Sequence, residues 1–391
     1  MFTRRLFLVA SLLLVALIPA HARAQAQADA STHVERGLAR LLDSMEVAVL
    51  AGNPDACLAL SDLSEDVFAQ EQRNWAADLD KHAPETFELE LGDEIALVNE
   101  SEATIELTMT WNMPERKRRR VSFPARFTRG DDGWKYAGEH WSRVEGDLIL
   151  ALHADGLDEA ARLVAEVWPE VRRSVNEQFG ITPDDGLLDH TQQVKLYGSM
   201  AHLQASIHLS YADEHGGLAG WNEPGESIKM IARGRLSADR LRPLLSHEYG
   251  HVCAFAFGPS ANTMPWWLLE GLAEAASAPF SRTRRMSESV MRRVAARDNI
   301  APWQSIADFE NTPPEFAHHV YRQGHHMVMY VDEQFGLDRR NQWARAQARG
   351  QSLDEATRGA LGISFQELDR RWRETLQPEP VQVPDEDPDR S

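Results

Sequence analysis

The stretch LLSHEYGHVC, residues 244–253, places two histidines four positions apart, with a glutamate directly after the first. Positions four apart lie on one face of an α-helix, so His247 and His251 can present their imidazole rings to a single point. Glu248 lies about 100° further round the helix, which puts its carboxylate beside that point rather than on it. Two imidazoles with an adjacent carboxylate are the arrangement that holds zinc and activates its water. Because this spacing also arises by accident, the interpretation depends on a third ligand.

A third ligand of suitable type follows at a sensible distance. Eighteen residues, Val252 to Leu269, separate His251 from Glu270. The Gly-Pro and Pro signals in FGPSANTMP, residues 257–265, predict that one helix ends there and another begins, which returns Glu270 to the histidines. Three protein ligands with one open position are typical of a catalytic zinc site, whereas structural sites are closed by four. The chain contains only two cysteines, so a cysteine-rich structural site is excluded.

The pattern HEYGH, then eighteen residues, then the glutamate of LLEGLAE resembles the motif of the gluzincin metallopeptidases. The similarity is to their aminopeptidase-like branch and its bacterial peptidase MA-like relatives, and it covers roughly residues 148–376. It implies that His247, His251 and Glu270 bind Zn²⁺ and that Glu248 is the general base. The fold it implies for this region is a mostly helical metallopeptidase domain with a small mixed sheet.

Two further residues bear on the third ligand. The metzincin alternative fails because Phe257 stands where that group needs a histidine. Glu274 lies one turn after Glu270 and is the rival ligand. We expect it instead to accept a hydrogen bond from a ligand histidine and so to orient the ring. The simpler interpretation of Glu274 is a solvated carboxylate on the helix.

An oxyanion donor is also needed opposite the metal. In the resembling family a tyrosine on a later helix has this role. The segment HHVYRQGHHMVMYVDEQFG, residues 318–336, offers Tyr321, Tyr330, His325 and His326. We expect Tyr321 to be the donor, while a helix tyrosine at a packing edge is the alternative. Which of the four acts as the donor is left open by the sequence.

The cleft of the resembling family is bordered by a strand that pairs with an extended substrate. In this chain the stretch around Leu218 to Trp221 is the candidate for that strand. The aminopeptidases carry a Gly-x-Met-Glu-Asn element there that grips the free amine of the substrate, and this chain has none. The sequence therefore leaves endopeptidase and exopeptidase activity open. Trp266 and Trp267 precede Glu270, and for both we favour core packing over the lining of a specificity pocket.

The region 31–146 is predicted to be a separate α+β domain. Its first part has apolar residues at helical spacing, and later segments alternate apolar and polar residues as antiparallel strands do. The helical set is Val34, Leu38, Leu41, Leu42, Met45 and Val49, and the strands begin with Phe87, Ile105 and Val121. Helices followed by a meander predict a roll that weakly resembles NTF2-like or cystatin-like domains. Cys57 and Cys253 fall in different domains, so we expect two buried thiols.

The N-terminal end of the chain predicts export, and the C-terminal end predicts a disordered tail. Residues 1–26 contain an arginine pair, Arg4 and Arg5, then an apolar stretch from Leu6 to Ala20 and small-x-small cleavage sites. This is a signal peptide rather than a membrane span, which requires roughly 20 apolar residues. It directs the chain to the periplasm or to secretion, and both general and twin-arginine export fit. Residues 377–391 are rich in proline and acidic residues and are predicted to be a disordered tail.

The net charge of −19 argues against partners such as nucleic acid or anionic lipid. The sequence therefore predicts an exported zinc-dependent metallopeptidase that acts on a peptide or protein substrate, with no stable membrane span after signal cleavage. The alternative is a non-catalytic envelope protein that uses a retained metallopeptidase fold as a binding platform. The substrate's identity and the oligomeric state are not encoded in a recognisable way.

Overall fold

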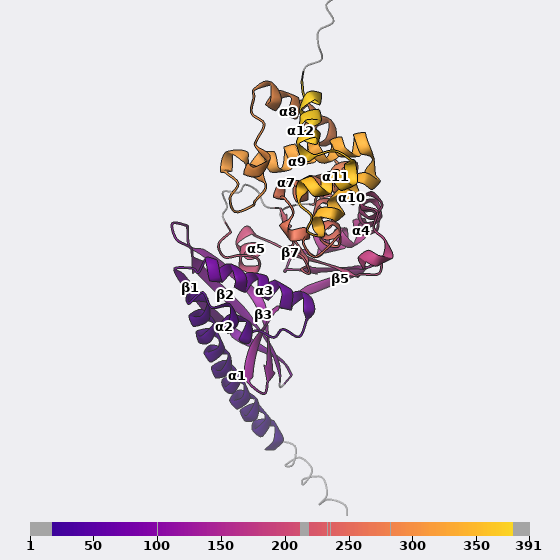
Figure 1. The fold of residues 1–391 in the computed structure, drawn as a ribbon. Helices are drawn as coiled ribbons and strands as arrows, with labels where there is room; N and C mark the ends of the chain where they lie inside the picture. The colour runs from indigo at the N-terminus through magenta and orange to yellow at the C-terminus, as the bar shows by residue number, and fades with distance from the viewer. Residues whose placement is uncertain are drawn as a thin grey trace, which may run out of the picture. The chain divides into compact units, whose positions relative to one another are not determined.

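The computed structural model describes residues 18–99, 101–211, 219–232, 234, 236–281 and 283–377. The first 17 residues of the predicted signal peptide, the tail from residue 378 onward and Leu218 of the predicted cleft strand lie outside the described residues. Contacts divide the chain into two compact units (Figure 1). The first unit is Met1–Trp141 with Met200–Tyr211, and the second is Ser142–Ser199 with Ala212–Ser391. Among the described residues, no helix is both long and apolar enough to cross a membrane.

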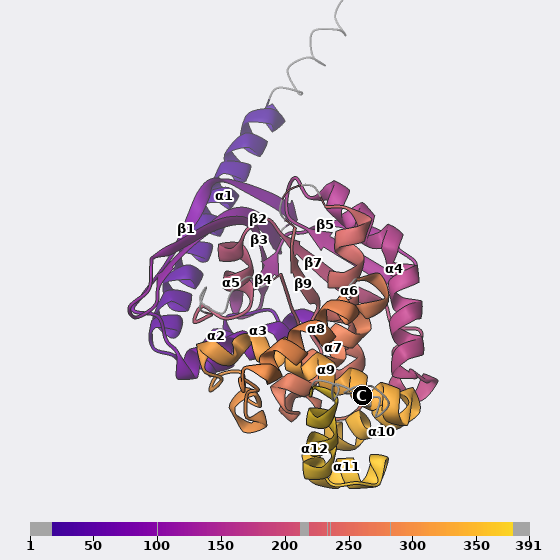
Figure 2. The same cartoon turned by 90° about the horizontal axis from the view of Figure 1, so that it is seen from above.

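The first unit is built from three helices followed by an antiparallel sheet, as the sequence predicts. The helices are α1 (Ile18–Leu50), α2 (Pro54–Ala59) and α3 (Asp66–Lys81). The strands β1 (Thr86–Asn99), β2 (Glu102–Asn112), β3 (Arg119–Gly130) and β4 (Gly133–Glu139) pair in sequence order. The helical stripe on α1 is buried against β1 (Figure 2). In the sheet, Phe87 lies opposite Trp111 and Leu89 opposite Met109, so the predicted alternation forms one apolar face.

A short segment around α5 (Met200–Ser206) packs into the first unit, although the sequence assigned it to the second domain. The indole nitrogen of Trp75 donates to the carbonyl of Ala205 over 3.1 Å. His202 Nε2 lies 2.7 Å from Glu139 Oε2, and the imidazole stacks on Phe123. These contacts join residues far apart in sequence, which explains why no local pattern predicts them.

The second unit has a small mixed sheet, as the resemblance implies. Its strands are β5 (Ser142–Gly146), β6 (Ile149–His153), β7 (Gln192–Tyr197), β8 (Gly220–Trp221) and β9 (Ile228–Ile231). Their order is β5-β6-β7-β9-β8, with β6, β7 and β9 parallel and both outer strands antiparallel to their neighbours. Strand β8 ends the sheet among the described residues and contains part of the predicted cleft strand.

Helices form the rest of the second unit. They are α4 (Asp158–Phe179), α6 (Ala238–Phe255), α7 (Trp266–Ser277), α8 (Thr283–Ala296), α9 (Ala317–Phe335), α10 (Leu337–Ala348), α11 (Leu353–Leu361) and α12 (Phe365–Thr375). Helix α4 buries one apolar face and packs against α6 (Figure 2). At that contact Trp168 meets Tyr249 edge to face, and the Tyr249 hydroxyl donates to Asn176 Oδ1 over 2.9 Å. The HEYGH stretch lies on α6 and Glu270 on α7, and these two helices pack together.

The glycine inside HEYGH allows α6 and α7 to approach closely. A Cβ atom at Gly250 would lie 2.8 Å from Ala276 Cβ and 3.1 Å from Ala273 Cα, which is closer than side-chain atoms tolerate. The absence of a side chain therefore lets the two helices come near enough for their polar residues to meet.

Both cysteines are buried free thiols, as expected.

Candidate metal centre

Helices α6 and α7 bring the three predicted ligands together. One potential ligand atom each from His247, His251 and Glu270 lies within 4.8 Å of the other two. Glu270 Oε2 is 3.2 Å from His247 Nε2 and 3.5 Å from His251 Nε2. Among the described residues this is the group of His, Cys, Asp and Glu side chains that could hold a metal ion. The four-residue spacing of the histidines on α6 and the turn between α6 and α7 therefore bring the three ligand atoms together.

The state of Glu270 fits a bound cation. Its Oε1 accepts a hydrogen bond from Trp266 Nε1 over 3.0 Å, whereas its buried Oε2 has the ring nitrogens of His247 and His251 near it, at 3.2 and 3.5 Å. Burial by itself raises the pKa of Glu270, but the adjacent His251 and His247 rings lower it well below its usual range. The result is an ionised carboxylate oxygen that faces two imidazole nitrogens, which is a donor set suited to a metal.

Glu274 contacts the other ring nitrogen of His247. Its Oε1 lies 3.4 Å from His247 Nδ1, on the side of the ring away from Glu270. Burial lowers the pKa of His247, but the two glutamates raise it well above its usual value. A carboxylate at Nδ1 fixes the ring and leaves Nε2 for a metal. The geometry therefore favours Glu270 as the ligand and Glu274 as the acceptor that orients His247.

Glu248 lies beside the three-ligand group and is buried on α6. Its Oε2 accepts a hydrogen bond from Asn222 Nδ2 over 3.3 Å, and its backbone carbonyl accepts one from the same nitrogen over 2.9 Å. Burial raises the pKa of Glu248, partly offset by the two histidines. Asn222 is not among the residues predicted from the sequence, and the one signal that could have found it is its position directly after the candidate cleft strand.

A protein-family model matches part of this chain. Residues 184–378, which carry the whole site, match the family model described as Peptidase MA superfamily. This match supports a gluzincin-like peptidase region. No curated protein matches the chain significantly.

The solved structures that are similar to this chain include two different kinds of protein. One is an M1 zinc metallopeptidase from Deinococcus radiodurans, with 15% identity and a TM-score of 0.36 over 77% of this chain and 64% of that chain. This chain thus spans less than two thirds of the length of that enzyme. The other is a putative scytalone dehydratase from Novosphingobium aromaticivorans, with 12% identity and a TM-score of 0.25 over 28% of this chain and 83% of that chain.

Tyr321 lies against a tryptophan that contacts Glu270. Its ring meets Trp266 edge to face, with centroids 6.1 Å apart, and Trp266 is the residue that donates to Glu270. Tyr321 is 38% exposed. Trp267 is fully buried against Trp303, and Trp266 packs partly buried against the same core, as predicted. The Trp266 indole also donates to Glu270.

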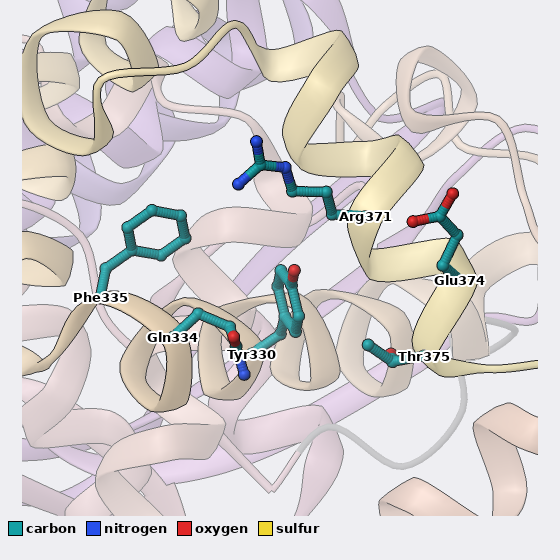
Figure 3. Close-up of a pocket in the computed structure, with 6 residues that line it drawn as sticks. All are labelled: Tyr330, Gln334, Phe335, Arg371, Glu374 and Thr375. Atoms are coloured by element: carbon teal, nitrogen blue, oxygen red, sulfur yellow. The ribbon is translucent and has the colours of Figure 1, made fainter.

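The three other candidate donors have different surroundings. His325 is buried near Glu274. Burial raises the pKa of the Glu274 carboxyl, but His247 and, to a smaller extent, His325 lower it below its usual value. His326 Nδ1 accepts a hydrogen bond from Trp372 Nε1 over 2.9 Å and so joins α9 to α12. Tyr330 lines a separate cavity of about 480 Å³ between α9 and α12 (Figure 3). The other residues of that cavity are Gln334, Phe335, Arg371, Glu374 and Thr375.

Proposed function

We propose that this protein is an exported zinc-dependent metallopeptidase that hydrolyses peptide bonds with Glu248 as the general base. The observation that carries the proposal is the convergence of His247, His251 and Glu270, whose ligand atoms lie within 4.8 Å of one another. The match of residues 184–378 to the Peptidase MA superfamily supports it.

The donor set of the site is typical of zinc. Two imidazole nitrogens and one carboxylate leave a fourth tetrahedral position for water or substrate. When bound, the zinc would activate that water and polarise the carbonyl group of the substrate. The remaining steps fall to side chains of the chain itself.

Glu248 is placed to move the proton. It is not needed to hold the metal, because the three ligand atoms come from other residues. Its carboxylate accepts a proton from the attacking water and then delivers it to the leaving amine. The burial that raises its pKa favours the first of these transfers. Tyr321 is the side chain that we assign to the developing oxyanion, because it adjoins Trp266 beside Glu270 and is accessible.

Strand β8 is the element that we assign to the substrate backbone. It pairs antiparallel with β9 through Gly220 and Trp221, and its other side ends the sheet among the described residues. An extended peptide can add to such an edge by backbone hydrogen bonds. Gly220 also lies against Glu248, so a peptide on this edge would pass the proposed base.

A peptide-library digest with wild type and Glu248→Gln tests the proposal. The variant keeps the shape and a hydrogen-bonding group but cannot accept the proton, so cleavage should fall by about 10²–10⁴-fold or more. Zinc content and melting temperature should stay close to those of the wild type. A wild type that holds zinc yet cleaves nothing in a broad library would instead be a binding platform.

A further inference from the structure

Asn222 makes two hydrogen bonds to the same residue of α6. Its Nδ2 donates to the backbone carbonyl of Glu248 over 2.9 Å and to Oε2 of the Glu248 carboxylate over 3.3 Å. A side-chain amide nitrogen carries two hydrogens, so both bonds form at once. The orientation of the amide follows from its partners, because the reversed orientation would place Oδ1 against two acceptor oxygens. Asn222 thus ties the segment after β8 both to the helix and to the carboxylate.

The other oxygen of Glu248 lies against a glycine of β8. A Cβ atom at Gly220 would lie 2.2 Å from Glu248 Oε1 and 2.4 Å from Cδ, well inside any tolerated contact. Any side chain at this position would therefore displace the carboxylate. Gly220 lies against one carboxylate oxygen of Glu248 and Asn222 donates to the other, so the two residues restrict the conformation of this side chain beside His247 and His251.

We propose that Asn222 is a positioning residue, which holds the Glu248 carboxylate in place for proton transfer and acts on the reaction only through Glu248. The proposal rests on the proposed function, in which Glu248 is the base. A general base must lie within hydrogen-bond reach of the proton it removes, and a displacement of about 1 Å can cost about 10²-fold in rate. A glutamate side chain has several rotatable bonds, and these two contacts restrict it.

Steady-state kinetics of the full-length zinc enzyme test this role. Asn222→Ala should lower kcat by about 10–100-fold while KM and zinc content change little, because neither substrate nor metal contacts are removed. In the Glu248→Gln background the same substitution should cause little further loss, since residues that act as a unit are not additive. An unchanged kcat, a rise in KM alone, or an equal loss in both backgrounds would overturn the proposal.

A second measurement needs no activity. Gly220→Ala should lower the melting temperature of the wild type by about 3 °C or more, because the added methyl group overlaps the Glu248 side chain. In a Glu248→Ala background, which removes that side chain, the loss should be smaller. Equal losses in both backgrounds contradict the contact and with it the positioning role. If the wild type cleaves no peptide, the proposed function itself fails, and the melting experiment still reports whether the contact exists.

Discussion

Glu270 and Glu274 lie one helical turn apart on α7 and contact different nitrogens of His247. This difference predicts unequal effects on metal binding. Glu270→Ala removes a ligand and should therefore cost far more zinc affinity than Glu274→Ala. Glu274→Ala should lower zinc affinity by about 10–100-fold, because it removes only the carboxylate that orients the His247 ring. Zinc affinities of the two variants, measured by competition with a chelator, check the order. The reverse order would make Glu274 the ligand.

At the scale of elements, an ion pair joins α10 to the turn after α4. Both carboxylate oxygens of Asp185 accept from Arg345, over 2.5 and 2.8 Å, and this holds the pKa of Asp185 at about 2. Because the folded-state pKa lies below the ordinary 3.8, the pair stabilises the fold above that pH and stops doing so as the pH falls towards 2. Asp185→Asn should lower the free energy of unfolding by about 1–2 kcal/mol at pH 7. Urea titrations at several pH values should show the gap to wild type narrowing below pH 4, and a gap independent of pH would contradict the assignment.

The elements also show what a sequence can predict. Helix α1 and strands β1 to β3 follow from apolar periodicity, and His247 and His251 share a face because about four residues span one helical turn. Strands β5 and β6, of five residues each, are not predicted by the sequence patterns. The packing of α5 into the first unit, and the contacts of Asn222 and Gly220 with Glu248, join residues distant in sequence. A local sequence pattern cannot predict contacts between residues that are so far apart in the chain.

For the whole molecule, the central claim is that this fold assembles a zinc site from two helices of the second unit. Elemental analysis of dialysed full-length protein tests that claim most directly. The wild type should hold about one zinc per chain, and His247→Ala or His251→Ala should abolish it, because three protein ligands are the minimum of such a site. Wild-type protein without stoichiometric zinc, or histidine variants that keep it, would contradict the account.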